Sequence, residues 1–229
     1  MVYALFFLLV AVQFFVEAAL LGGYFWIFAW PGVSFGLVGL AYLGLGPRVF
    51  GKRASGRLAW WSTLLLFPYL LLTWLTWHLV RRMSSEDCFN EVAPGIFVGR
   101  RPLPGELPRE ITLLVDLTAE FPEHHQVRAG REYLAAPMLD AGIASEAAFR
   151  QLVPHIAHWP GSVYIHCAQG HGRTGTVAAA VLVAKGFHAT PEGAIEAMQR
   201  VRPKLQLNRN QLKFVKKICV PMNEPASAD

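Results

Sequence analysis

The chain has 229 residues, of which 53% are hydrophobic and 16% are charged, and its formal net charge at pH 7 is +5. The mean hydropathy of +0.32 is high for a water-soluble protein. These values exclude a disordered chain, a collagenous fibre and a disulfide-rich secreted scaffold. The basic residues form no long stripe, so we expect no nucleic-acid partner.

The polar residues are unevenly distributed, and the change falls near residue 80. Residues 1–80 contain one acid, Glu17, four bases and six of the seven tryptophans. Residues 81–229 contain the other 15 acids and 17 bases. We therefore expect a membrane anchor at residues 1–82, a linker at 83–89, a water-soluble domain at 90–220 and a flexible tail at 221–229.

The anchor is expected to cross the bilayer as about three helices. No Lys or Arg occurs from Met1 to Gly46, a run about twice the ~20 residues that one spanning helix needs. We expect a hairpin that turns near Trp30-Pro31-Gly32, because Pro and Gly end helices readily. The run from Leu58 to Val80 is long enough for another span, and two spans in total are the alternative. Glu17 is expected to pair with Gln13 rather than to mark a transport site.

Beyond Ser84-Ser85, short apolar runs alternate with helical patterns. The apolar runs predict strands at 95–99, 111–117, 133–136 and 162–166, and the patterns predict helices at about 145–159, 173–185, 191–201 and 209–220. The start and stop signals are Ser145, Thr190 with Pro191, Asn208 with Gln211, and Gly186. The alternation predicts an α/β domain with a central, mostly parallel sheet flanked by helices.

The most informative stretch runs from Val163 to Gly175, where a buried strand ends at Cys167 and a glycine-containing loop leads to Arg173 and a helix. The N–H groups of such a loop can turn inward around an anion, and the helix N-terminus adds partial positive charge. Arg173 offers a planar fork for two phosphate oxygens. The predicted phosphate-binding loop consists of His166, Cys167, Ala168, Gln169, Gly170, His171, Gly172 and Arg173.

The same positive field favours the thiolate of Cys167, the nucleophilic form of cysteine, which can attack a bound phosphate in line. The alternative is a structural Cys167 and a solvated Arg173. Six specified residues in one register arise by chance at a frequency of ~10⁻⁵ or less, which argues against that alternative. A Walker-type nucleotide loop is excluded because no Gly-Lys-Ser/Thr follows the glycines.

The pattern His166-Cys167-x5-Arg173-Thr174 resembles the signature loop of the cysteine-dependent protein tyrosine phosphatase superfamily, and the small domain resembles its dual-specificity branch. The resemblance covers roughly Asn90 to Val220. Other segments resemble the family less specifically; they are Val92–Gly99, Val115–Glu120, Tyr133–Asp140, and Arg202-Pro203 with Asn208 and Gln211. It implies hydrolysis of phosphomonoesters through a phosphocysteine, with no cofactor and no metal, because the loop itself supplies the positive charge.

Such a reaction needs a general acid for the leaving oxygen, and Asp140 is the best candidate. It lies 27 residues before Cys167 in a loop after a strand, and the family places its acid on such a loop. Thr174 is expected to donate to the Cys167 sulfur, and His166 is expected to be buried and to orient the loop. The rival candidates are Asp116, Glu120, Asp87 and the pair His124-His125. Cys88 and Cys219 are expected to be structural or incidental.

The predicted function is a membrane-tethered phosphatase of the protein tyrosine or dual-specificity type. The alternative is a phosphatase for a phosphorylated lipid headgroup, such as a phosphoinositide or phosphatidylglycerophosphate. His171 stands where phosphoinositide 3-phosphatases carry a lysine, but Ala168 stands at the position of their other lysine. A non-catalytic scaffold is disfavoured because Cys167, Arg173 and Asp140 are all present.

The orientation of the anchor has opposing indications. Counting four bases in the loop Pro47–Arg57 against Arg81-Arg82 places the water-soluble domain outside the cytoplasm. A reactive thiolate survives better in a reducing compartment, and phosphoproteins and phosphorylated lipid precursors are concentrated in the cytoplasm. We therefore expect an integral membrane protein with a cytoplasmic catalytic domain, whose partners are the bilayer and a phosphoprotein or phosphorylated lipid.

Overall fold

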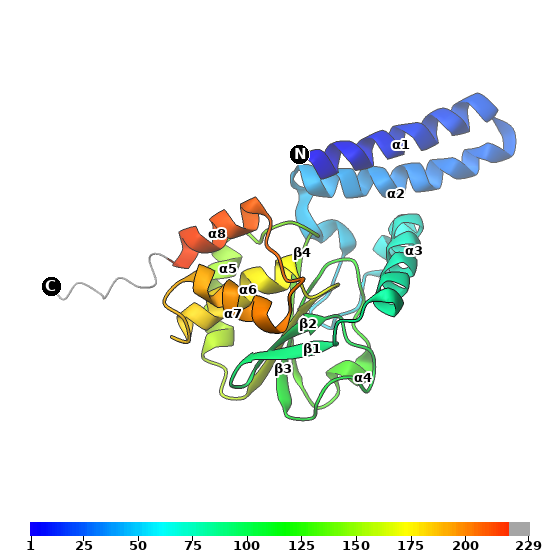
Figure 1. The fold of residues 1–229 in the computed structure, drawn as a ribbon. Helices are drawn as coiled ribbons and strands as arrows, with labels where there is room; N and C mark the ends of the chain where they lie inside the picture. Colours follow the sequence, from blue (N-terminus) through cyan, green and yellow to red (C-terminus); the bar gives the residue numbers. More distant parts are fainter. Residues whose placement is uncertain (220–229) are drawn as a thin grey trace. The chain divides into compact units, whose positions relative to one another are not determined.

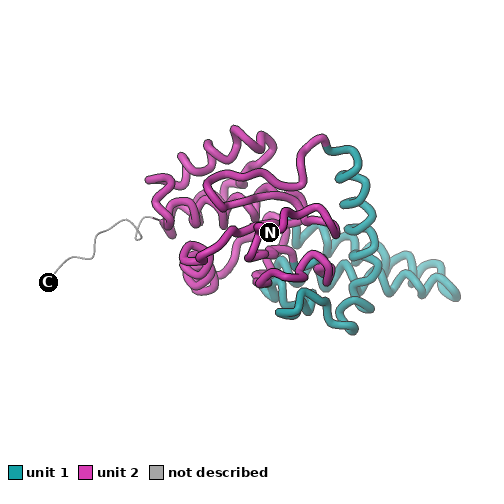
Figure 2. The backbone as a smooth tube through the Cα atoms, turned by 90° about the horizontal axis from the view of Figure 1, so that it is seen from below, with its two compact units in different colours: residues 1–84, 119–122 teal, residues 85–118, 123–229 magenta. Residues whose placement is uncertain are grey.

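The computed structural model describes residues 1–219, so the predicted tail at 221–229 lies outside the described residues. The chain divides into two compact units, drawn in two colours in Figure 2. The anchor unit consists of residues 1–84 and the short segment 119–122. The sheet unit consists of residues 85–118 and the residues from 123 onward.

The anchor unit is helical. Three of its helical stretches are long and apolar enough to cross a membrane, which agrees with the predicted three spans; they are Val2–Leu21, Gly23–Phe50 and Trp60–Met83. The regular helices within them are α1 (Val2–Leu21), α2 (Ala29–Leu40) and α3 (Trp60–Met83), and irregular helical turns cover Gly23–Phe28, Ala41–Leu45 and Gly46–Phe50. Pro68 lies inside α3 without ending it.

The hairpin turn of the anchor lies at Gly22-Gly23, so the predicted turn at Trp30-Pro31-Gly32 is wrong. Both glycines have a positive φ, +63° and +53°, which residues with a Cβ rarely adopt. Trp30 and Pro31 instead lie in the first turn of α2, where the missing N–H of a proline breaks no helical hydrogen bond.

Small residues allow α1 and α2 to pack closely. The buried residues of α1 are Ala4, Ala11 and Ala18, at heptad spacing, and a Cβ on Gly39 of α2 would lie 2.8 Å from the side chain of Leu8. The Nε2 of Gln13 donates to Glu17 at 2.8 Å, as predicted. The segment 119–122 belongs to this unit through α3: the Trp74 indole donates to the carbonyl oxygen of Glu120 at 2.9 Å.

The sheet unit contains a five-stranded sheet in the order β1-β2-β5-β3-β4 (Figure 1). The strands are β1 (Phe89–Ala93), β2 (Ile96–Arg100), β3 (Ile111–Thr118), β4 (Glu132–Met138) and β5 (Ser162–Cys167). Only β1 runs antiparallel to its neighbour, so the mostly parallel α/β sheet is confirmed. The first strand was not predicted separately, because the turn at Pro94-Gly95 divides one apolar run into a hairpin.

The helices of the sheet unit begin and end near the predicted residues. They are α4 (His125–Arg128), α5 (Glu146–Ala157), α6 (Gly172–Ala184), α7 (Pro191–Val201) and α8 (Arg209–Cys219). Ser145 and Thr190 cap α5 and α7 through their side-chain oxygens, and Gly186 follows α6 with a φ of +76°. The short α4 was not predicted, since one turn is too brief to show a helical pattern.

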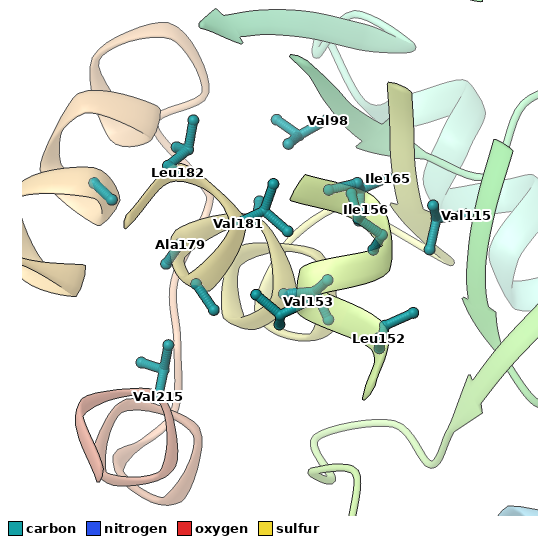
Figure 3. Packing of buried hydrophobic residues seen from close by; sticks show 14 of the residues in the cluster. Val98, Val115, Leu152, Val153, Ile156, Ile165, Ala179, Val181, Leu182 and Val215 are labelled. Carbon is teal, nitrogen blue, oxygen red and sulfur yellow. The ribbon is translucent and has the colours of Figure 1, made fainter. Parts of the chain in front are cut away.

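The core of this unit lies between the sheet and the helices α5 to α8. Figure 3 shows side chains of α6, such as Val181, near Ile156 of α5 and near Val98 and Ile165 of the sheet. A smaller cluster on the opposite face gathers Phe97, Leu114 and Tyr164 with Val127 of α4. Burial on both faces fixes the central strand β5, and its carboxyl end is where ligands bind in parallel sheets.

Candidate active site

The predicted phosphate loop joins the end of β5 to the start of α6. Cys167 is the last residue of β5. Its sulfur accepts a hydrogen bond from the Gly170 N–H at 3.3 Å. Gly170 has a φ of +74°, and a Cβ there would lie 2.2 Å from the carbonyl carbon of Gly99. The loop therefore curls back over Cys167 in a conformation that requires glycine.

Arg173 is 2% exposed and lies in the first turn of α6. Its Nη1 donates to the carbonyl oxygen of Met138 at 3.0 Å, and its Nη2 lies 3.2 Å from Oδ1 of Asp140. The structure thus brings the predicted phosphate ligand and the predicted general acid together. The Asp140 side chain is 75% exposed, whereas the Arg173 side chain is buried, so the pair joins the protein surface to the interior of the site.

The acid loop, residues 139–143, is also held from its other end. Asn208 Nδ2 donates to the carbonyl oxygen of Ala141 at 2.8 Å, and Gln211 Nε2 donates to that of Gly142 at 3.0 Å. Ala141 has a φ of +53°, which costs a non-glycine residue about 1 kcal/mol. Two amide side chains at the start of α8 therefore hold the exit of this loop.

The expected hydrogen bond from Thr174 to the Cys167 sulfur is not formed. The Thr174 hydroxyl is buried and has no hydrogen-bond partner among the described residues. An unsatisfied buried hydroxyl in the first turn of α6 is a donor that remains available to a bound group. The rival acids lie elsewhere: Asp116 and Glu120 are buried, whereas Asp87 and the pair His124-His125 are exposed.

His166 is fully buried, as predicted, in a cluster with two carboxylates. Its Nε2 lies 3.5 Å from Oε2 of Glu123 and 4.0 Å from Oδ1 of Asp116, and its Nδ1 lies 3.4 Å from the Cys167 carbonyl oxygen. Asp116 Oδ2 also accepts a hydrogen bond from Tyr133, whose pKa is raised by burial and by the Asp116 charge. The ring therefore lies between the Cys167 carbonyl and two buried carboxylates, behind the phosphate loop.

The side chains of Asp116, Glu123 and His166 could hold a metal ion, since their ligand atoms all lie within 4.8 Å of one another. Both oxygens of Asp116 accept hydrogen bonds, from Thr118 and Tyr133, and Arg101 lies 3.9 Å from Glu123. Hydrogen bonds thus occupy both oxygens of Asp116, and we interpret the cluster as an internal support for His166.

The three cysteines of the described residues are free. Burial raises the pKa of the Cys88 thiol to about 12 and that of Cys219 to about 11, so both are neutral at pH 7. Neutral thiols are poor nucleophiles, so Cys167 remains the candidate nucleophile among the three.

Comparisons with known proteins decide the family. Residues 105–217 match the family model described as "Swiss Army Knife protein, DSP-PTPase phosphatase domain". These residues form a phosphatase domain of the DSP-PTPase type. The resemblance seen in the phosphate loop is therefore confirmed.

This phosphatase domain also resembles a curated plant protein, phosphatidylglycerophosphate phosphatase PTPMT1 of Arabidopsis thaliana. The two are 28% identical over 159 residues, which cover 62% of this chain. The chain spans about half of the relative's length, 46%.

Solved structures share the fold at lower identity. A crystal structure of PTPMT1 in complex with PI(5)P is 22% identical and has a TM-score of 0.53, covering 59% of this chain and 97% of the other. Tk-PTP in the active form is 24% identical and has a TM-score of 0.51, covering 57% of this chain and 95% of the other. These similarities establish the fold of the phosphatase domain.

Sequence reasoning missed several residues that contact the phosphate loop of the phosphatase domain. Arg202 had been noted only as part of an Arg-Pro pair, although it is 1% exposed and donates to the carbonyl oxygens of Gln169 and Gly170. Glu123 and Glu86 carried no signal at all. Glu86 contacts a partner 85 residues away, and no local pattern reports such a contact.

Proposed function

We propose that this protein hydrolyses phosphomonoesters through a phosphocysteine formed at Cys167. The loop N–H groups and Arg173 would bind the phosphate, and the Cys167 thiolate would attack phosphorus in line. As the S–P bond forms, the bond to the leaving oxygen breaks and Asp140 protonates that oxygen. Asp140, now a carboxylate, would take a proton from water as the water attacks phosphorus. The S–P bond then breaks and phosphate leaves.

The observation that carries this proposal is the joint position of three groups. Cys167 ends the central strand, Arg173 begins the following helix, and Asp140 lies 3.2 Å from the Arg173 guanidinium. A guanidinium that bridges the acid loop and the phosphate loop places the proton donor beside the site of the leaving oxygen. We further propose that the buried Thr174 hydroxyl donates to the Cys167 sulfur when the S–P bond breaks.

The first candidate substrate class is phosphotyrosine in proteins, with phosphoserine or phosphothreonine as further targets. The exposed acid loop supports it, because a protruding phosphorylated side chain needs access from solvent. The second candidate class is a phosphorylated lipid headgroup. Two observations favour it: three apolar helices that can span a bilayer, and the name of the plant relative, a phosphatidylglycerophosphate phosphatase.

The test uses the full chain in detergent and then in vesicles. The wild-type protein is expected to hydrolyse a small aryl phosphate, and Cys167→Ser is expected to lower the rate at least ~10³-fold while still binding phosphate. Comparable rates for the two proteins would overturn the covalent mechanism. A phosphotyrosine peptide, vesicles with phosphatidylglycerophosphate and vesicles with a phosphoinositide then separate the two substrate classes by kcat/KM.

We also propose that the phosphatase domain faces the cytoplasm. A thiolate nucleophile persists in a reducing compartment, and both candidate substrate classes occur there. Protease treatment of sealed right-side-out and inside-out vesicles is the measurement. Cleavage of the domain only in inside-out vesicles is the expected result, and cleavage only in right-side-out vesicles would reverse the orientation.

A further inference from the structure

A carboxylate from the start of the sheet unit contacts the phosphate loop. The Oε2 of Glu86 lies 2.9 Å from Nε2 of His171, and the two side chains are only 14% and 27% exposed. His171 stands between the two glycines of the phosphate loop and immediately before α6. Through this contact, a side chain of the phosphate loop is bound to a residue that precedes the first strand of the sheet.

Arg202 joins the same two segments from behind. Its guanidinium donates to the phosphate loop at Gly170 O (3.0 Å) and Gln169 O (2.9 Å). It also donates to Asp87 O and to Asn90 Oδ1, both at 3.0 Å, and lies 3.9 Å from Oε2 of Glu86. A buried arginine thus links residues 86–90 to two successive carbonyl groups of the phosphate loop.

These links act on the groups that would bind phosphate. When the Gln169 and Gly170 carbonyls point at Arg202, they point away from the anion, which leaves the loop N–H groups to face inward. His171 has φ −115° and ψ −104°, a sparsely populated conformation that persists only where surrounding contacts hold it. The bond to Glu86 is such a contact, since it fixes the side chain of that residue.

We propose that residues 86–90 are a strap that positions the phosphate loop, with Glu86 and Asn90 as positioning residues and Arg202 as the link. The proposal rests on the proposed function, because it assigns the loop to phosphate binding. The strap follows α3 closely in the chain: only Ser84 and Ser85 separate Glu86 from the end of α3 at Met83. Residues 86–89 of the predicted linker at 83–89 therefore belong to the strap.

The charges around the strap explain why Glu86 can lie near an anion site. A carboxylate alone would repel a phosphate dianion. Here the imidazole of His171 and the guanidinium of Arg202 both face the Glu86 carboxylate, so its oxygen contacts these two groups rather than the ligand. Removal of Glu86 leaves His171 unrestrained, which should weaken anion binding more than it slows the chemical steps at Cys167.

The experiment compares the affinity of full-length variants for inorganic phosphate, by calorimetry and by inhibition of aryl phosphate turnover. Glu86→Ala is expected to weaken phosphate binding about tenfold and to raise KM by a similar factor, with kcat changed less than about threefold. Glu86→Gln keeps an oxygen that accepts from His171 Nε2 and should recover most of the affinity. Asn90→Ala, which removes one acceptor of Arg202, should weaken binding about threefold.

Glu91→Ala is the matched control, because Glu91 is the next acid beyond the strap and its carboxylate accepts from Gly95 N in the β1–β2 turn instead. It should bind phosphate as the wild type does. Wild-type affinity in a folded Glu86→Ala protein, checked by its Tm, would overturn the strap. Calorimetry separates this outcome from failure of the proposed function. If the wild type is inactive but binds phosphate, and Glu86→Ala binds it about tenfold more weakly, the strap is supported and the proposed hydrolysis is not.

Discussion

Helices α1 and α6 are both apolar, yet one leaves its large side chains exposed and the other is buried on every side. Leu5 and Leu9 of α1 are about 60% exposed, whereas all residues of α6 from Arg173 to Val183 are buried. The 20 residues of α1 span ~30 Å, the thickness of a hydrocarbon core, and the 13 residues of α6 span ~20 Å. Length and surroundings, rather than composition, distinguish a helix that could span a membrane from one that is buried in a protein core.

The polar groups of the two helices also differ in their partners. In α1, Gln13 and Glu17 satisfy each other within one turn. In α6, Arg173 reaches the acid loop, more than 30 residues away in sequence. A polar group that is satisfied locally stabilises its own helix, whereas one satisfied from a distant element fixes the geometry of a site. The four predictions below test this contrast.

The largest effect is expected where the long-range contact of α6 is used in chemistry. Asp140→Asn should slow hydrolysis of an alkyl phosphate, which has a poor leaving group, by ~10²–10⁴-fold. An activated aryl phosphate needs little protonation and should lose far less. The measurement is kcat/KM for both substrates with the full chain.

Glu120→Gln provides the matched control, because Glu120 was a rival acid and its carboxylate accepts instead from the Ala119 N–H. It should leave the ratio between the two substrates unchanged. Equal losses on both substrates for Asp140→Asn would assign Asp140 to structure rather than to proton transfer.

The local signals in the sequence predicted nearly all of the sheet unit. A cap, a proline at the start of a helix and a glycine at its end are local features, so Ser145, Thr190 and Gly186 marked boundaries that the structure reproduces within a few residues. The anchor turn was placed wrongly because Gly22-Gly23 and Trp30-Pro31-Gly32 carry similar local signals. Only the packing of α1 on α2 selects between them.

The residues of the candidate site also fall into those that local sequence predicts and those that it does not. The spacing from Cys167 to Arg173 lies within one loop, and Asp140 follows a recognisable strand, so both could be predicted. Glu86 and Arg202 contact the phosphate loop from remote parts of the chain, and pairings of that kind are decided by the three-dimensional fold. Glu123, one of the two buried carboxylates behind His166, was missed for the same reason.

A second prediction separates the two units physically. A fragment that starts at Ser84 keeps the strap and the whole sheet, so it should hydrolyse soluble aryl phosphate at a rate near that of the full chain. On a substrate embedded in vesicles it should be ~10²-fold slower, because tethering raises the local concentration without changing the chemistry. Fusing an unrelated membrane helix in front of Ser84 should restore most of the rate. An unchanged rate on vesicles would favour protein substrates.

A third, smaller effect concerns the contacts that hold the acid loop. Asn208 caps α8 through Oδ1, which accepts from the Asn210 and Gln211 N–H groups, and it holds Ala141 through Nδ2. Asn208→Asp keeps the capping oxygen but loses the donor, so stability should change little while alkyl phosphate turnover falls about tenfold. In an Asp140→Asn background the same change should add almost nothing. Additive losses would show that Asn208 does not act through Asp140.

The smallest effect is a difference in acid sensitivity between the two units. Burial by itself raises the pKa of Glu106, but hydrogen bonds from Arg100 and from the Leu103 N–H lower it to about 2, against an ordinary value of 4.5. Because the folded pKa is depressed, the stabilisation is complete above about pH 4.5 and is lost as the pH falls towards 2. Glu106 is partly exposed, so solvent screening limits its contribution to about 1 kcal/mol or less.

Hydrogen exchange on the full chain in detergent, read for peptides of each unit between pH 6 and pH 3, measures this difference. The anchor unit holds only Glu17 and Glu120 as acids, so its protection, corrected for the intrinsic exchange rate, should stay nearly constant. Protection around β2 and the segment that follows it should fall with pH in the wild type. In Glu106→Gln it should be lower at pH 6 and should depend less on pH. Equal slopes for the two proteins would show that the Arg100–Glu106 pair does not contribute to the acid sensitivity of the sheet unit.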